Sequence, residues 1–207
     1  MGLVIDLLKK IPIDLGQGAV AERTFGKQIA LKLVPPGEGG RALDLGCREG
    51  HQTRWLQKRG YEVTSVDVEA LFDGAQVVDA NEPLPFPDRY FDLVWSSEVI
   101  EHLKDPRRSL TELRRVTKPG GRLILTTPNS YMWLFSLLAK AGLGPEKLQR
   151  PDHLHFFDLD AIRSIAPDAD LYGYFPYLGP KRTIYDERLV GWLSPTFVIS
   201  LREPPVK

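Results

Sequence analysis

A carboxylate stands between a short apolar run and a glycine-rich turn in the stretch Arg41-Ala-Leu-Asp-Leu-Gly-Cys-Arg-Glu-Gly50. The apolar residues predict a buried strand, the glycines free the backbone for a turn, and the residues that follow predict a helix that ends at Gly60. A strand, turn and helix in this order form the ligand-binding corner of an open α/β sheet. Asp44 lies near the end of the strand, where its charge could hold an ammonium or sulfonium group.

The glycine spacing separates two classes of ligand. A dinucleotide site needs the pattern G-x-G-x-x-G, so that backbone amides and a helix N-terminus can hold a pyrophosphate. After Gly46, the positions of the second and third glycine carry Arg48 and His51. Asp44 would also repel a phosphate, whereas it suits S-adenosylmethionine, which carries both an ammonium and a sulfonium group.

Two further acids end predicted strands. The segment 61–67 alternates apolar and polar residues and ends on Asp67, which lies 17 residues after Gly50. This is close to the interval at which an acid of the second strand meets a ribose in doubly wound folds, and one carboxylate can accept hydrogen bonds from both ribose hydroxyls. The segment 75–79 predicts a third strand, which ends on Asp79. The connection 68–74 is too short for a full crossover helix.

These motifs resemble those of the class I S-adenosylmethionine-dependent methyltransferases, most closely the small-molecule branch of the type 11 and type 23 kind. The glycine turn is similar to LDLGCGxG, and residues 84–103 are similar to the LPFPDxSFDLV and SxEVxEHL signatures. The resemblance covers residues 20–165. It implies an α/β, Rossmann-like fold with a seven-stranded, mostly parallel sheet, an antiparallel last strand inserted between the fifth and sixth, helices on both faces and a reduced second crossover helix.

The cofactor that the resemblance implies is S-adenosyl-L-methionine. The residues expected to bind it are Asp44, Gly46, Cys47, Arg48, Gly50, Asp67, Val68, Asp79, Ala80 and Ser96. By the resemblance, Asp79 accepts a hydrogen bond from the adenine amino group and the Ala80 amide donates one to the ring. Arg48 stands where the motif usually has glycine. Since a side chain does not easily take a positive φ, we expect the loop to run differently or the pocket to be partly filled. Arg48 either reaches the cofactor carboxylate or points to solvent.

Three histidines are candidates for the reaction centre. His102 follows Glu101, and a histidine of near-neutral pKa could take a proton from an acceptor hydroxyl while an acid orients it. A structural role for this pair is the alternative. His153 and His155 lie on the same side of an extended segment, and by the resemblance this segment returns over the substrate pocket. They are candidates for substrate contact or general base, or each is satisfied by the backbone. No third metal ligand is apparent, so no metal site is predicted.

The chain is expected to form one domain over residues 1–207. Residues 1–36 predict an N-terminal helical cover, with helices over 2–11 and 21–33. Residues 130–160 predict a segment on the substrate side, with an apolar helix over 131–142 that forms core or a lid, or touches a membrane surface. Strands are expected over 170–177 and 196–201, joined by a loop over 182–192.

Composition excludes several classes. Lys+Arg and Asp+Glu both number 27, so no global basic field attracts nucleic acid, and the arginines Arg107, Arg108, Arg114 and Arg115 are expected to form a solvated face. The single cysteine excludes a disulfide framework, and no signal peptide or membrane-spanning run is apparent. A cytoplasmic location is expected.

The chemistry of the cofactor, more than any one side chain, sets the predicted function. We expect methyl transfer, with oxygen of a small or lipid-linked acceptor as the favoured target. Two alternatives remain. The first is a protein that binds S-adenosylmethionine or S-adenosylhomocysteine without catalysis, and the second is an RNA methyltransferase.

Overall fold

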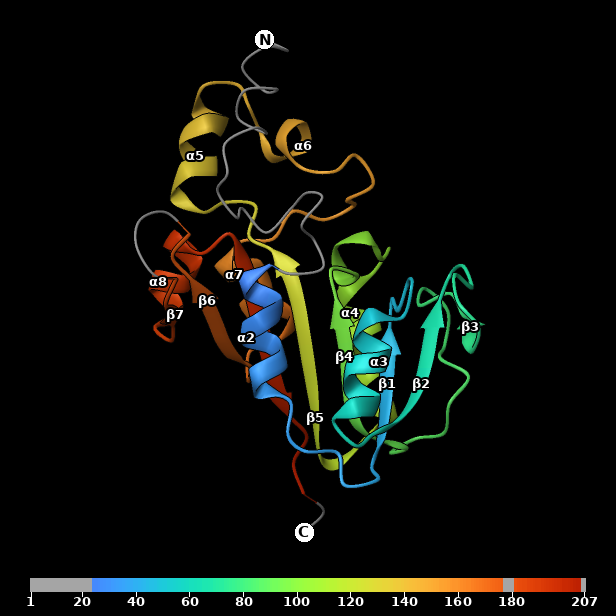
Figure 1. The fold of residues 1–207 in the computed structure, drawn as a ribbon. Coiled ribbons are helices and arrows are strands. Elements are labelled where there is room, and N and C mark those ends of the chain that lie inside the picture. The colour runs from blue at the N-terminus through green and yellow to red at the C-terminus, as the bar shows by residue number, and fades with distance from the viewer. Residues whose placement is uncertain (1–23, 177–180, 206–207) are drawn as a thin grey trace.

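The computed structural model describes residues 24–176 and 181–205. Its described residues form one eight-stranded sheet with the order β3-β2-β1-β4-β5-β8-β6-β7 (Figure 1). The strands are β1 (Arg41–Leu45), β2 (Glu62–Asp67), β3 (Ala75–Val77), β4 (Phe91–Ser97), β5 (Thr117–Pro128), β6 (Asp170–Tyr174), β7 (Thr183–Ile184) and β8 (Thr196–Arg202).

The predicted sheet is confirmed. Strands β1 to β5 pair in parallel, and β8 runs antiparallel between β5 and β6. The difference from the predicted seven strands is β7, a two-residue strand at the edge beside β6.

Helices cover both faces of the sheet, as the continuous apolar runs of its central strands require. The helices are α2 (Phe25–Leu33), α3 (His51–Lys58), η2 (Ile100–His102), α4 (Pro106–Val116), α5 (Trp133–Lys140), α6 (Pro145–Leu148), α7 (Leu159–Ile165) and α8 (Glu187–Leu193). One core lies under α2 and α3, where Ile29 and Leu56 pack with Trp95. The other core receives Leu113 of α4 and Ile162 of α7. Each fully buried side chain of this size contributes about 1.5–3 kcal/mol.

Caps set several helix starts. The side chains of Thr24, Asp105, Asp158 and Asp186 accept hydrogen bonds from backbone N–H groups in the first turn of α2, α4, α7 and α8, respectively. The predicted helix over 21–33 is described from Phe25, and the predicted helix over 2–11 lies outside the described residues. In the described part, α2 packs against β5, β6 and β8.

Several boundaries differ from the sequence predictions. The expected loop over 182–192 contains β7 and helix α8, because Asp186 caps a turn whose Val190 is buried. The apolar helix begins at Trp133 rather than 131, since the Tyr131 N–H donates to the Asn129 side chain and is not part of the helix. The connection 68–74 contains no helix, as predicted.

The segment 130–160 lies at one end of the sheet. Helices α5 and α6 stand beyond the carboxyl end of β5 (Figure 1), the end toward which the parallel strands point. Its apolar residues are divided between interior and surface: Met132 and Phe135 are buried, whereas Tyr131 and Leu137 are exposed. Among the described residues, no helix is long and apolar enough to cross a bilayer.

Candidate functional site

The carboxyl ends of β1, β2, β4 and β5 meet at one edge of the sheet, where the crevice of an open α/β sheet binds ligands. The glycine turn lies there. Gly46 and Gly50 have φ of 79° and 74°, and a Cβ on Gly46 would lie 2.3 Å from Cγ2 of Val99. Gly46 therefore has to be glycine for both conformation and space. Gly50 forms the left-handed N-cap of α3.

Arg48 corrects the expectation for this loop. It takes the left-handed conformation itself, with φ of 46°, so the loop keeps the shape that a glycine would allow. This conformation costs a non-glycine residue about 1–2 kcal/mol. The guanidinium is exposed, and its Nε lies 3.9 Å from Glu49. The side chain is exposed in the structure, and its contact with the cofactor carboxylate stays a prediction.

The backbone of the turn holds Asp67. The Arg48 N–H donates to one carboxylate oxygen across 2.9 Å, and the Val68 N–H donates to the other across 2.8 Å. Each oxygen keeps a lone pair for a further donor, because an ionised carboxylate offers about four acceptor positions. The carboxylate is thus held at the end of β2 with acceptor capacity for a pair of hydroxyls.

Asp44 is a buried acid with only 1% of its surface exposed. The Thr53 hydroxyl of α3 donates to it across 2.6 Å, and because Thr53 has one proton, Ser65 must be the donor in its 2.8 Å contact with Thr53. Burial raises the pKa of Asp44 to about 6, although the Thr53 hydrogen bond opposes this shift. A cationic partner would stabilise the ionised form of this carboxylate, because its attraction would offset the hydration that is lost on burial.

Cys47 packs inside the turn. Burial raises the pKa of its thiol to about 12, and Asp44 and Asp67 add to that shift. The thiol therefore stays protonated near neutral pH, which makes it a poor nucleophile and a poor metal ligand.

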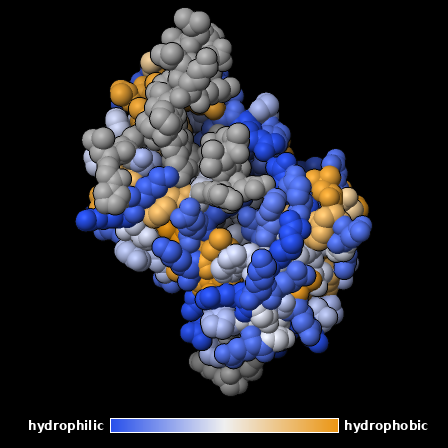
Figure 2. Space-filling view, viewed as in Figure 1, coloured by the Kyte–Doolittle hydropathy of each residue, from blue (hydrophilic) through white to orange (hydrophobic). Residues whose placement is uncertain are grey.

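The third acid lies beyond the end of its strand. β3 ends at Val77, two residues earlier than predicted, and the Asp79 carboxylate accepts from the N–H and the side-chain amide of Asn81. These hydrogen bonds lower the pKa of Asp79. Three exposed apolar residues belong to this part of the chain, Val68, Leu71 and Val77, and Figure 2 shows apolar surface at the place of β3.

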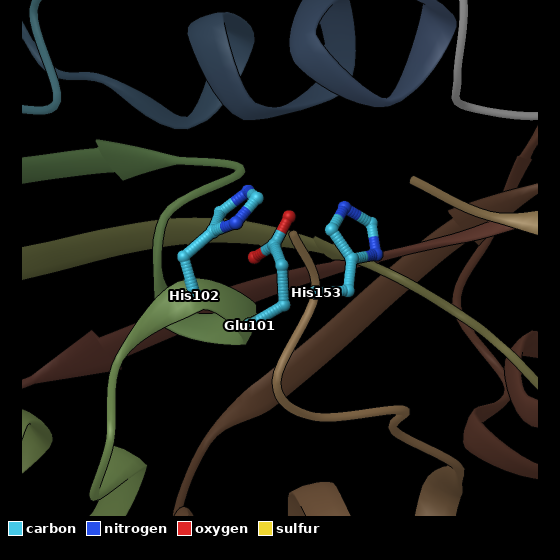
Figure 3. Close-up of side chains that lie close together, drawn as sticks. All are labelled: Glu101, His102 and His153. Atoms are coloured by element: carbon cyan, nitrogen blue, oxygen red, sulfur yellow. The ribbon is translucent and has the colours of Figure 1, made fainter. Parts of the chain in front are cut away.

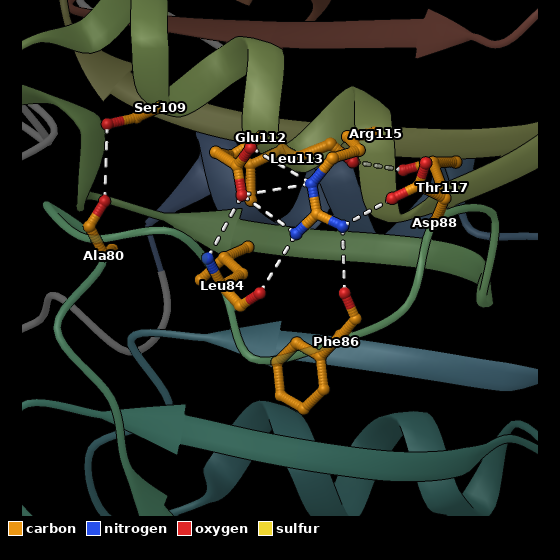
Figure 4. Close-up of polar contacts among 9 residues, drawn as sticks. All are labelled: Ala80, Leu84, Phe86, Asp88, Ser109, Glu112, Leu113, Arg115 and Thr117. Atoms are coloured by element: carbon orange, nitrogen blue, oxygen red, sulfur yellow. Dashed lines mark hydrogen bonds and ion pairs between the residues drawn. The ribbon is translucent and has the colours of Figure 1, made fainter.

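An arginine of α4 fixes the loop that follows Asp79. The Arg115 guanidinium donates to the carbonyls of Leu84 and Phe86 and pairs with Glu112 and Asp88, while Glu112 accepts from the Leu84 N–H (Figure 4). On the same helix, the Ser109 hydroxyl lies 3.5 Å from the Ala80 carbonyl.

The prediction of a solvated arginine face was therefore wrong for Arg115. It was also wrong for Arg114, which pairs with Asp168 and Glu203. Arg107 and Arg108 are exposed. The periodicity of α4 places all four on its polar side, but part of that side contacts the loop 80–88, Asp168 before β6 and Glu203 after β8.

Ser96 lies within β4 and is buried. Its neighbour Ser97 lies on the opposite face of the strand, since side chains alternate. The Thr126 hydroxyl donates to Glu98 across 2.9 Å, so Ser97 must donate in its 2.7 Å contact with Thr126. Glu98 is left-handed, with φ of 59°. This chain of hydroxyls at the ends of β4 and β5 was not predicted from the sequence.

Glu101 and the loop 149–157 form a second polar cluster at the same end of the sheet. The Glu101 side chain is 1% exposed, and one carboxylate oxygen accepts from the Thr127 hydroxyl across 3.0 Å. The other oxygen, Oε1, has no hydrogen-bond partner among the described residues. Burial and the nearby Glu98 raise the pKa of Glu101 well above its usual range.

Two of the three candidate histidines meet at Glu101. The rings of His102 and His153 pack edge to face with centroids 4.8 Å apart, and the carboxylate of Glu101 lies between them in Figure 3. Burial, with His102 nearby, lowers the pKa of His153 to about 4, so its imidazole is neutral near pH 7. His155 does not join them, because its Nε2 lies 3.3 Å from the Lys104 carbonyl. The fold thus pairs His153 with His102, whereas His155 lies apart from this pair, and the roles of the three histidines stay predictions.

The arrangement fits a ligand with a cationic end and a ribose. Asp44 is a buried anion that accepts a hydrogen bond from the neutral Thr53 hydroxyl, the glycine turn leaves no side chain at Gly46, and Asp67 retains acceptor positions. Asp44 and Asp67 lie on the adjacent strands β1 and β2. Asp44 is paired with Ser65, which lies two residues before Asp67 at the carboxyl end of β2. S-adenosylmethionine has these groups, and the site residues fit it.

Comparison with known proteins also indicates a methyltransferase. A family model described as a methyltransferase domain matches residues 43–125. A probable chloroplastic tocopherol O-methyltransferase of Oryza sativa is 41% identical over an alignment of 190 residues, and the match covers 82% of this chain and 50% of that protein. A malonyl-[acyl-carrier protein] O-methyltransferase of Erwinia billingiae is 34% identical over 120 residues, 54% of this chain and 47% of that protein. The chain spans about half the length of these curated relatives.

Solved structures share the fold. A methyltransferase of Thermotoga maritima, described as a possible histamine N-methyltransferase, is 20% identical, covers 86% of this chain and 88% of its own, and has a TM-score of 0.62. A methyltransferase of Archaeoglobus fulgidus is 18% identical, with coverage of 86% and 93% and a TM-score of 0.63. At these identities the likeness concerns the fold alone.

Proposed function

Because the chain belongs to the class I S-adenosylmethionine-dependent methyltransferases, we propose that it transfers the methyl group of this cofactor to an oxygen atom of a small or lipid-linked acceptor. The observation that carries the proposal is the turn between Asp44 and Asp67, in which a buried acid and a tethered acid flank a left-handed loop.

Each part of the turn has a binding role. Asp44 holds the ammonium group of the cofactor, which relieves the cost of the buried carboxylate. Asp67 accepts the ribose hydroxyls, and the corner at Asp79 and Ala80 lies against the adenine. Bound S-adenosylmethionine supplies an electrophilic methyl group on its sulfonium. The chain contributes orientation and exclusion of water, since in-line attack needs mainly alignment.

Oxygen is the proposed acceptor atom because two of the relatives are named O-methyltransferases. An apolar body on the acceptor is supported by the segment 130–160, because α5 stands beyond the carboxyl end of β5 (Figure 1) and carries apolar residues such as Phe135. That this segment acts as a lid remains a prediction, as do the cytoplasmic location and the roles of His102, His153 and His155 in proton transfer.

The alternative of binding without catalysis loses its support at Arg48. That residue favoured it because a side chain was expected to disturb the pocket, yet the loop keeps a left-handed backbone and the side chain is exposed. No observation favours an RNA acceptor, and the formal net charge is zero.

Transfer of a labelled methyl group tests the proposal. The chain is incubated with methyl-labelled cofactor and two acceptor panels, one of phenols and quinols with apolar tails and one of acyl carboxylates. We expect label in at least one hydroxyl or carboxyl oxygen, and a loss of more than about tenfold in the Asp67→Ala variant. Binding of the cofactor without transfer to either panel would contradict the proposed oxygen acceptor. A labelled methyl group on nitrogen or carbon would show that the acceptor atom is not oxygen.

A further inference from the structure

We propose that Glu101, His102 and His153 together bind one divalent transition-metal ion. One ligand atom from each residue lies within 4.8 Å of the other two. Zinc-class ions bind nitrogen and oxygen at about 2.0–2.2 Å, so tetrahedral ligands of one ion lie about 3.4 Å apart. The cluster needs to contract by up to about 1.4 Å, through rotation of the three side chains, to reach bonding geometry. The site is not apparent in the sequence, because Glu101 and His102 lie about 50 residues before His153.

The Glu101 carboxylate is the strongest indication of a ligand. It is almost completely buried, and its Oε1 has no hydrogen-bond partner among the described residues. An unpaired carboxylate oxygen in the interior loses its hydration without replacement, which is unfavourable. Figure 3 shows this carboxylate between the two imidazole rings. A cation bound there would supply the missing partner.

The hydrogen bonds of His102 free the correct nitrogen. Its Nδ1 lies 2.9 Å from the Asp152 carbonyl, which can only accept, so Nδ1 carries the proton. In the neutral ring Nε2 then has a free lone pair. A metal-bound histidine commonly donates its other N–H to a carbonyl or carboxylate, and the Asp152 carboxylate lies 3.7 Å from the same Nδ1.

His153 has the same arrangement. Its Nδ1 lies 3.3 Å from Oε1 of Gln149, and the Ser130 hydroxyl donates to that oxygen across 3.0 Å. With Gln149 in this orientation, Nδ1 is the donor and Nε2 is free for a metal. The two rings thus offer equivalent nitrogens from different parts of the chain.

Backbone hydrogen bonds connect these parts. The N–H groups of Leu154 and His155 both donate to the carbonyl of Glu101, across 2.9 and 3.0 Å. They join the 3-10 turn η2 to the loop that carries His153. The ligand set is therefore held together before an ion arrives, which reduces the ordering cost of binding.

The donor set indicates the class of ion. Two imidazoles and one carboxylate suit zinc, iron, cobalt or manganese, whereas magnesium prefers an all-oxygen set. Three protein ligands leave coordination positions open. Resting on the proposed function, we place the acceptor oxygen at one of these positions, where the cation would lower the pKa of its hydroxyl and favour the nucleophilic form. The Thr127 hydroxyl bonded to Glu101 is at the end of β5, the same edge as the cofactor turn.

Cobalt binding tests the site without any turnover. The protein is treated with a chelator, titrated with CoCl₂, and followed by the visible absorption of coordinated cobalt. We expect one Co²⁺ per chain, displaced by Zn²⁺ but not by an equal concentration of Mg²⁺. Glu101→Gln, His102→Ala and His153→Ala should each weaken binding more than about tenfold. His155→Ala is the matched control and should keep the affinity, because its ring contacts Lys104 and not the cluster.

Binding of S-adenosylhomocysteine, the demethylated cofactor, is measured for every variant. A variant that keeps this binding is folded, so its loss of cobalt reports on the ligand set. Absence of cobalt absorption in the unmodified protein would overturn the metal site. The site would also be overturned if Glu101→Gln and His153→Ala bound cobalt as tightly as the unmodified protein. Either result would leave the proposed methyl transfer intact. Conversely, cobalt binding with no cofactor binding would support the metal site and contradict the proposed function.

Discussion

The backbone N–H of Arg48 donates to the carboxylate of Asp67 across 2.9 Å. The residue that departs from the glycine pattern thus holds the acid of the neighbouring strand, through a group that every residue except proline has. Arg48 makes this bond while its own backbone is left-handed, with φ of 46°. The function of the position lies in its backbone, and the arginine side chain is free to vary.

Arg48→Gly tests this assignment. Glycine relieves the left-handed conformation, worth about 1–2 kcal/mol, but adds backbone entropy to the unfolded chain, worth about 0.5–1 kcal/mol. We expect the free energy of unfolding in urea to stay equal or rise by up to about 1 kcal/mol. Affinity for S-adenosylhomocysteine, measured by calorimetry, should change by less than about threefold. A loss of more than about tenfold would mean that the guanidinium contacts the cofactor.

Asp44→Asn separates stability from binding. At pH 7 the wild-type carboxylate is ionised although it is buried, and the amide removes that cost while it can still accept from Thr53. We expect the variant to be more stable by about 1–3 kcal/mol at pH 7 and to bind the cofactor at least about tenfold more weakly. A variant that is both less stable and equally tight in binding would contradict the role of Asp44.

The same carboxylate gives stability a defined pH dependence. Its pKa in the folded protein is about 6, above the ordinary value of 3.8, so the folded state holds the proton more tightly. The contribution of Asp44 is therefore full below about pH 4 and is lost as pH rises through about 6, for a total of roughly 3 kcal/mol. Other acids titrate in this range, so the measured quantity is the difference between wild type and Asp44→Asn. This difference should widen in favour of the variant from pH 4 to 7, and a constant difference would be inconsistent with the raised pKa.

Arg115→Lys should loosen the loop 80–88. Lysine keeps the charge but cannot hold Glu112, Asp88 and the carbonyls of Leu84 and Phe86 at once. We expect a loss of about 1–3 kcal/mol in unfolding free energy and a weaker affinity for S-adenosylhomocysteine, since Asp79 and Ala80 precede this loop. Arg107→Lys on the same helix is the control, because Arg107 is exposed, and it should change neither quantity. If both substitutions lowered the unfolding free energy equally, the cause would be the helix propensity of lysine and not the loss of the Arg115 contacts.

Local signals made most of the fold predictable. The strand that ends at Leu45, the glycines at 46 and 50 and the acid at the end of β2 each follow from a few neighbouring residues, and the structure has them at one edge of the sheet. The missing helix over 68–74 was predictable for the same reason.

Long-range contacts were not predictable. The meeting of Glu101 with His153 depends on how the loop after α6 returns to η2, which neither segment encodes by itself. Arg115 looked solvated because its helix shows only which side is polar, not that a loop covers that side. Arg48 was misjudged because a rule for single residues made a left-handed arginine unfavourable, whereas its hydrogen bond to Asp67 and the flanking glycines hold it there.

Calorimetric titration with S-adenosylhomocysteine tests whether the turn between Asp44 and Asp67 binds the cofactor, with NAD as the control ligand and Asp67→Asn as the control variant. A cofactor site predicts one bound S-adenosylhomocysteine per chain, no binding of NAD and a loss of more than about tenfold in the variant. At about 100 times its dissociation constant the ligand should add about 2.7 kcal/mol of stability and raise the unfolding midpoint by roughly 5–10 °C. No binding, or equal binding by Asp67→Asn, would contradict the assignment of the turn between Asp44 and Asp67 as the cofactor site.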